Sequence, residues 1–185
     1  MNFSVKHAVL AMVVGMGGAM LLQKAGVNFG FAPKSVPALS YTDTKGVSRA
    51  LNASNKPTVV VLWVTPCSYC TRSMNVLDTV RRLYPESDLD IVGFYLNQTS
   101  DADLDRMAAA EGHTFTMARG QPTGAFVQQL VGGLDFRGTG RDIYVIGPDG
   151  HYTTVDASDL SKPDYGILQQ VRSLLINKHH LKERV

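Results

Sequence analysis

The hydrophobic positions of this chain fall into two alternating patterns. A continuous β-branched and apolar run occupies residues 58–64, and a second, mostly apolar stretch occupies residues 89–97, as expected of strands that are buried in a parallel sheet. Each run is followed by a segment with apolar residues at helical spacing, residues 71–85 and 100–112. Ser100 and the acidic residues after it are typical of a helix start. The pattern therefore predicts repeated strand–helix units.

The remaining segments continue this alternation. We expect a short helix at residues 43–54, an extended piece at residues 113–118, and a second short helix at residues 121–133 that starts near Pro122. Residues 141–156 are expected to form two strands joined by a Gly-Pro-Asp-Gly turn, and residues 162–178 a closing amphipathic helix. Strands that alternate with helices and end in a hairpin predict an α/β fold: a three-layer sandwich whose mixed central sheet is flanked by helices.

The first 25 residues differ from the rest. Residues 8–22 contain no charge, and as a helix they would reach about 22 Å, somewhat less than a bilayer core of roughly 30 Å. We interpret residues 1–25 as a membrane anchor or signal segment and favour an uncleaved anchor, because no small-residue cleavage site precedes Lys24. Residues 26–40, rich in Gly, Pro and Ser, are expected to be a linker, and residues 41–185 the folded domain.

Composition narrows the range of functions. With 185 residues, 44% of them hydrophobic, the chain is long enough for one domain with a real core. The net charge of +2 is too small for a nucleic-acid-binding face. Either interpretation of the first 25 residues places the domain outside the cytoplasm, where disulfides persist, so the two cysteines of the chain are of special interest.

Both cysteines, Cys67 and Cys70, lie where the first buried strand is predicted to turn into a helix. Unsatisfied N–H groups and the positive end of the helix dipole favour a thiolate at the first of them. Cys67 is therefore the candidate nucleophile toward a partner's disulfide, and Cys70, one turn later, the candidate resolving thiol.

Three other interpretations of the pair remain open. A structural zinc site needs a second ligand pair, which the scattered histidines do not supply. Two thiolates suffice for Cu(I) delivery. An inert structural disulfide would gain little stability from so short a loop. We expect redox chemistry with no cofactor and no resident metal.

From Thr58 to about Leu175, the order of elements and the stretch "LWVTPCSYC" resemble the thioredoxin superfamily, above all membrane-tethered bacterial thiol–disulfide proteins of the TlpA and ResA kind. The resemblance implies a thioredoxin-like fold with Trp63 beneath the motif, Cys67 as nucleophile and Cys70 as resolving thiol. The text "CSYC" is also similar to the motifs of periplasmic disulfide isomerases.

The residues around the cysteines carry further expectations from this resemblance. Ser68 and Tyr69 tune the redox potential in relatives, and Pro66 either shapes the turn or has a functional role. Asp78 and Glu111 are candidate proton acceptors for Cys70, although solvated carboxylates on a helix face are the commoner case.

One departure concerns the cis-proline that the family places before the strand that here reads "IYVIGPDG". The matching position holds Arg141, preceded by Gly140. A cis bond before a non-proline residue costs about 2.5–4 kcal/mol, so we expect this loop to be trans. Arg141 would then set a cation near Cys67. Alternatively, Pro122 is the cis-proline.

The sequence thus predicts an exported, membrane-anchored thiol–disulfide oxidoreductase, periplasmic at the inner membrane or soluble there after signal cleavage. Its expected partners are protein thiols and disulfides of the cell envelope and a membrane electron donor, and the domain is expected to be a monomer. Reductase, oxidase and isomerase are not separated. The alternatives are a non-catalytic scaffold of an envelope assembly, such as a conjugation or secretion apparatus, and a Cu(I)-handling protein.

Overall fold

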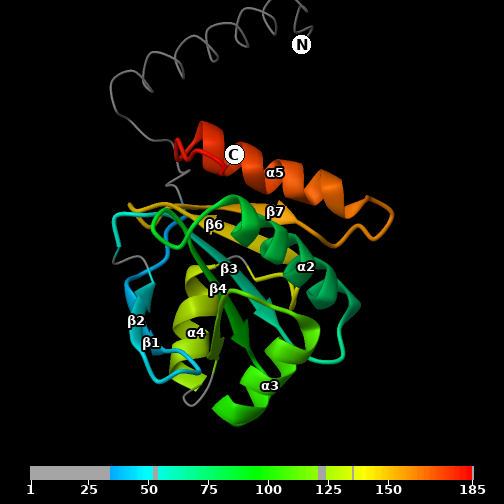
Figure 1. Cartoon of the computed structure of the whole chain (residues 1–185). Coiled ribbons are helices and arrows are strands. Elements are labelled where there is room, and N and C mark those ends of the chain that lie inside the picture. The colour runs from blue at the N-terminus through cyan, green and yellow to red at the C-terminus, as the bar shows by residue number, and fades with distance from the viewer. Residues whose placement is uncertain (1–33, 52–53, 121–123, 135, 185) are drawn as a thin grey trace, which may run out of the picture. The chain divides into compact units, whose positions relative to one another are not determined.

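The computed structural model describes residues 34–184, apart from residues 52–53, 121–123 and 135. In chain order the elements are β1 (Leu39–Thr42), β2 (Ser48–Leu51), β3 (Thr58–Trp63), α2 (Ser68–Leu83), β4 (Asp90–Tyr95), α3 (Asp101–Glu111), β5 (Thr116–Arg119), α4 (Gly124–Gly133), β6 (Asp142–Ile146), β7 (Tyr152–Asp156) and α5 (Asp164–Asn177). The strand–helix alternation predicted from residue 58 onward is therefore present (Figure 1).

The main sheet has five strands in the order β5-β4-β3-β6-β7. Strands β3, β4 and β5 run parallel, and β6 and β7 pair antiparallel to their neighbours. The central strand β3 is buried along its whole length, which explains its uninterrupted apolar sequence. The predicted mixed sheet, with a terminal hairpin, is confirmed.

Alternate side chains of β3 serve two separate cores. Val59, Val61 and Trp63 join the core with apolar residues of α2, α3 and α5. Val60 and Leu62 join the core on the opposite face, with residues of β1, β2 and α4. Figure 1 shows α2 and α5 on one side of the sheet and α4 with the β1–β2 pair on the other. The predicted three-layer sandwich is confirmed.

The helix expected over residues 43–54 is wrong. The described part of this segment forms a turn and strand β2, which pairs antiparallel with β1 and brings Leu51 opposite Leu39. The Asp43 carboxylate accepts the N–H groups of Lys45 and Val47 at 2.9 Å each. A side chain that satisfies these groups closes a turn, and burial of Leu39 and Leu51 then favours the hairpin.

Residues 34–40, which the sequence assigned to the linker, belong to the folded unit. Val36 is 2% exposed and Leu39 is 7% exposed, and the Val36 N–H donates to the Gly150 carbonyl at 2.9 Å. Because these two apolar side chains of a Pro-rich stretch are buried in the core, the folded unit begins before residue 41. The predicted anchor, residues 8–22, is outside the described residues. Within the described residues, no helix is long and apolar enough to cross a membrane.

Candidate redox site

The two cysteines lie at the junction of β3 and α2. Cys67 is the N-cap of α2, and the Cys70 N–H points at the Cys67 sulfur at 3.1 Å. The two sulfurs form a disulfide, with the Cα atoms 5.2 Å apart, inside the usual range for such bridges. A thiolate at Cys67 would meet the same N–H group and the positive end of the helix dipole.

The two sulfurs differ in accessibility. Cys67 is partly exposed, between the exposed residues Pro66 and Ser68, whereas Cys70 is only 2% exposed and packs in the core beside Met74. A partner sulfur can therefore approach Cys67 more easily than Cys70. This asymmetry is the one required of an attacking and a resolving cysteine.

Trp63 lies in the core next to the Cys-x-x-Cys motif. It is 1% exposed, its ring lies 4.6 Å from that of Tyr95, and Gly93 leaves room for it, since a Cβ there would stand 3.2 Å from the indole Nε1. The Tyr95 hydroxyl also hydrogen-bonds the Thr65 hydroxyl at 2.7 Å. Tyr95 was missed at the sequence level, because its place beside Trp63 depends on the pairing of β4 with β3.

The backbone that faces the cysteines comes from the segment "RGTGRD", which we call the 137–142 loop. The Gly140 N–H donates to the Leu62 carbonyl at 2.7 Å, and the Ser73 hydroxyl donates to the Gly140 carbonyl at 2.7 Å. The Thr139 carbonyl oxygen lies 3.8 Å from the Cys67 sulfur. A Cβ on Gly140 would stand 2.4 Å from the Cys70 nitrogen, so the loop packs directly on the motif.

The structure places Arg141 beside the motif rather than on the sulfurs. Its guanidinium lies 5.0 Å from the centre of the Tyr69 ring, a cation–π contact. The 137–142 loop is trans, as expected, and within the described residues the cis peptide bond precedes Pro66. The alternative cis-proline, Pro122, lies outside the described residues.

An ion pair closes the 137–142 loop. Arg137 holds both carboxylate oxygens of Asp142, whose side chain is fully buried. The Ala157 N–H donates to the Arg141 carbonyl at 2.7 Å. Arg137 and Asp142 were missed at the sequence level, although an aspartate at the start of a buried strand needs a partner of opposite charge.

A cavity of about 340 Å³ adjoins the cysteines. It is lined by Cys67, Cys70, Trp63, Met74, residues 64–66, Ser68, Thr71 and Glu111. Glu111 is the carboxylate of this lining, and its Oε2 lies 2.9 Å from His113 Nε2. The other ring nitrogen, Nδ1, lies 2.7 Å from Asp78 Oδ2. Asp78 is thus buried and bonded, which corrects its interpretation as a solvated helix-face carboxylate.

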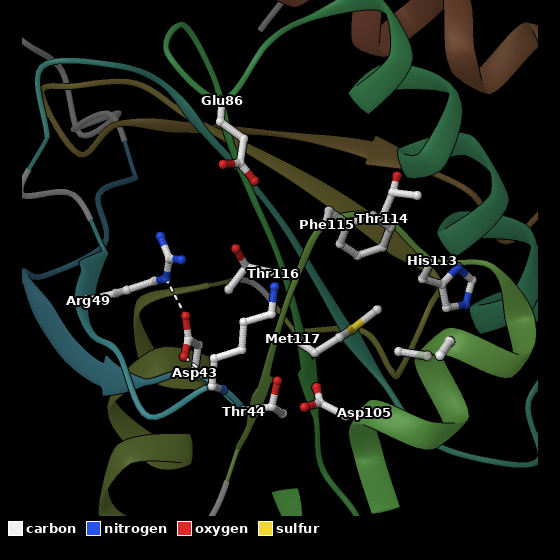
Figure 2. Close-up of a pocket in the computed structure, with 13 residues that line it drawn as sticks. Asp43, Thr44, Arg49, Glu86, Asp105, His113, Thr114, Phe115, Thr116 and Met117 are labelled. Atoms are coloured by element: carbon white, nitrogen blue, oxygen red, sulfur yellow. Dashed lines mark hydrogen bonds and ion pairs between the residues drawn. The ribbon is translucent and has the colours of Figure 1, made fainter. Parts of the chain in front are cut away.

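A second cavity, of about 400 Å³, lies between the β1–β2 turn, α3 and β5. In Figure 2, Asp43 and Arg49 face each other on one side of it and His113 lies on the opposite side. The Arg49 Nε donates to Asp43 at 2.7 Å. The cavity holds no sulfur nucleophile, and its buried carboxylate is already bonded by the protein.

Comparison with known proteins gives one family and a consistent fold. The Redoxin family model matches residues 32–143. No curated protein sequence matches the chain.

Three solved structures illustrate the shared fold. A thiol:disulfide interchange protein from Bacteroides sp. has a TM-score of 0.59 and 18% identity and covers 80% of this chain and 95% of its own. For the thioredoxin domain of a Bacteroides vulgatus thiol-disulfide oxidoreductase the values are 0.58, 20%, 77% and 97%. For a secreted Mycobacterium tuberculosis disulfide oxidoreductase they are 0.55, 14%, 74% and 96%.

The predicted superfamily and enzyme class are therefore confirmed. The chain belongs to the Redoxin family, and it combines the thioredoxin-like fold with the Cys-x-x-Cys pair of a thiol–disulfide oxidoreductase.

Proposed function

We propose that this protein is an exported thiol–disulfide oxidoreductase, anchored to the inner membrane by residues 8–22, that exchanges disulfides with protein partners through Cys67 and Cys70. The observation that carries the proposal is the unequal exposure of the two sulfurs, with Cys67 accessible at the start of α2 and Cys70 buried behind it. Such a pair forms a mixed disulfide at the outer sulfur and resolves it from the inner one.

Three observations support the location. The uncharged stretch at residues 8–22 suits an anchor, and one structural neighbour is described as secreted. An oxidising compartment is also where a Cys67–Cys70 disulfide persists. The natural partners are then proteins of the periplasm that carry exposed thiols or disulfides.

The test uses single substitutions in the full chain. Cys67→Ala is expected to abolish exchange with a protein disulfide, because the accessible nucleophile is lost. Cys70→Ala is expected to accumulate mixed disulfides that non-reducing electrophoresis detects. Exchange by the Cys67→Ala variant at the parent rate would refute the proposal.

The reduction potential of the pair decides the direction of electron flow. A value near −270 mV, about that of thioredoxin, indicates a reductase, and a value near about −120 mV indicates an oxidant. A reduction potential below about −300 mV would instead indicate a structural disulfide.

A second candidate function is a non-catalytic scaffold of an envelope assembly. The observation that favours it is the 137–142 loop, which faces the cysteines without a cis peptide bond. Full biological activity of a Cys67→Ala/Cys70→Ala double variant would support the scaffold and exclude the redox function.

A further inference from the structure

Ser73 makes a contact that the threonine hydroxyls of α2 do not make. The hydroxyls of Thr71 and Thr79 donate to carbonyls four residues earlier in the same helix, at 3.4 and 3.2 Å, as is common for helical Ser and Thr. Ser73 is 0% exposed, and its hydroxyl donates to the Gly140 carbonyl at 2.7 Å, 67 residues further along the chain. Ser73 therefore joins the helix that carries the cysteines to the 137–142 loop.

Gly140 is held through both of its backbone polar groups. Its N–H donates to the Leu62 carbonyl of β3 at 2.7 Å, and its carbonyl accepts the Ser73 hydroxyl. Gly140 is buried, and a Cβ there would stand 2.4 Å from the Cys70 nitrogen and 2.7 Å from its sulfur. A buried carbonyl without a donor is costly, so removal of the Ser73 hydroxyl would favour a loop position further from α2.

This attachment sets the position of the preceding carbonyl. Thr139 directly precedes Gly140 in the chain, and its carbonyl oxygen lies 3.8 Å from the Cys67 sulfur. A carbonyl oxygen beside a sulfur accepts a hydrogen bond from a thiol but repels a thiolate. Once the disulfide is reduced, the Thr139 carbonyl therefore favours the neutral form of Cys67.

Groups from several elements also act on the ionisation of Cys67. The Cys70 N–H of α2 lies 3.1 Å from the Cys67 sulfur and favours the thiolate, as does the Arg141 guanidinium beside the motif. The Glu111 carboxylate, at the end of α3, lines the same cavity and disfavours the thiolate. Because the N–H is nearer to the sulfur than the Thr139 carbonyl is, the carbonyl limits the thiolate without preventing it.

We infer that Ser73 is a positioning residue: it holds the Thr139 carbonyl against the Cys67 sulfur and thereby limits formation of the nucleophilic thiolate. The inference rests on the proposed redox function and adds a control on its first step. In that step the Cys67 thiol releases its proton to solvent, the sulfur keeps the electron pair, and the thiolate attacks a partner disulfide. A bond forms between Cys67 and one partner sulfur, and the other partner sulfur leaves as a thiolate. With the carbonyl in place, this step is slower wherever ionisation of Cys67 is incomplete.

The experiment measures the ionisation of Cys67 in the reduced full chain. The ultraviolet absorbance of the thiolate is recorded against pH for the parent and for Ser73→Ala, and both chains also carry Cys70→Ala, so that the signal belongs to Cys67. For Ser73→Ala we expect about tenfold more thiolate at pH values where the parent is mostly thiol, which is the size of effect of about one lost hydrogen bond. The two curves are expected to converge at high pH, where Cys67 is fully ionised in both chains.

Two variants separate the Ser73 hydroxyl from general effects on packing. Thr79→Ala removes a hydroxyl that bonds within the same helix; it is the matched control and is expected to titrate as the parent does. Ser73→Thr keeps a hydroxyl at the buried position and is expected to retain the thiolate fraction of the parent. Urea denaturation of the same samples reports any loss of packing separately.

The possible outcomes distinguish the inference from the proposed function. A thiolate fraction in Ser73→Ala that equals or falls below that of the parent would overturn the inference. A rise of equal size in Thr79→Ala or Ser73→Thr would also overturn it, because both variants keep a hydroxyl at position 73. Exchange of the unmodified chain with a protein disulfide, measured alongside, tests the proposed function on its own. If the Cys67 thiolate forms but this chain exchanges no disulfide, the proposed function is refuted.

Discussion

The two cavities of this domain have similar volumes, about 340 and 400 Å³, but their chemistry differs. The lining of the cavity at the cysteines includes the two bridged sulfurs, the indole of Trp63 and one carboxylate. The cavity behind the β1–β2 turn contains more charge, yet its buried Asp43 is satisfied by Arg49 and by two backbone N–H groups. The first contains the two sulfurs of the proposed exchange reaction, and the buried carboxylate of the second stabilises a turn.

The comparison shows that size and charge alone do not identify a site. A buried carboxylate with all its hydrogen bonds made by protein contributes to stability and has no capacity left for a ligand. A partly exposed sulfur at a helix N-terminus, with a buried second sulfur behind it, is placed to react with a partner. Substitutions that separate stability from exchange activity test this difference.

The largest expected effect comes from glycines with positive φ in the two regions. Gly140, with φ 64°, leaves no room for a Cβ beside the Cys70 backbone. Gly46 lies in the β1–β2 turn with φ 77° and open space around it. Gly140→Ala is expected to cost more than about 3 kcal/mol of unfolding free energy and to impair exchange, because backbone must move. Gly46→Ala is expected to cost about 1 kcal/mol, from backbone strain alone.

Urea denaturation and exchange kinetics on the same preparations measure both outcomes. Equal losses of stability in the two variants would contradict the close packing of the 137–142 loop on the motif.

A smaller effect is expected at the second cavity. Burial by itself would raise the pKa of the Asp43 carboxyl, but hydrogen bonds from Arg49, Val47 and Lys45 outweigh it and hold that pKa below its ordinary value. The folded pKa is therefore below the unfolded one, so this stabilisation is complete above about pH 4 and is lost as pH falls through the folded pKa.

Asp43→Asn is expected to lower the unfolding free energy at neutral pH by about 2 kcal/mol. Between pH 4 and pH 3, it is expected to lose less further stability than the parent does. Urea denaturation at both pH values gives the two differences. The rate of thiol–disulfide exchange by Asp43→Asn is expected to equal that of the parent. A slower exchange would show that the two cavities are coupled.

The smallest effect is expected at Arg141. Its guanidinium over Tyr69 places a positive charge beside the motif and so favours the reduced, thiolate-bearing state of the pair. Arg141→Gln is expected to make the reduction potential more negative by about 15 mV, which corresponds to a threefold change in the equilibrium constant. Equilibration with glutathione buffers measures it. An unchanged or less negative potential would show that Arg141 does not act on the thiolate.

Local patterns predicted much of this protein correctly. The strand-to-helix junction that carries the sulfurs was predicted from one continuous segment. That segment contains the apolar run of β3, the two cysteines and the apolar residues at helical spacing in α2. The cap of α3 was also correct, since the Ser100 hydroxyl accepts the Asp103 N–H at 3.1 Å. Such features depend on neighbours a few residues away along the chain.

Other features depended on distant parts of the chain. The segment around Asp43 was expected to be helical, and the burial of Leu39 against the core decided for a hairpin. The grouping of Asp78, Glu111 and His113 required the end of α3 to pack beside α2. No periodic pattern in the sequence predicts that these three side chains lie together.

By itself, then, the sequence determined the chemistry that is available: two cysteines with two residues between them at a strand-to-helix junction, in a chain with a charge-free segment near its start. The tertiary structure alone decided how these sulfurs are surrounded. It brought the 137–142 loop onto Cys70 and Glu111 to the cavity beside it. The physical reason is that spacing along the chain sets local backbone geometry, whereas packing of distant elements sets the exposure, charge and proton access of each sulfur.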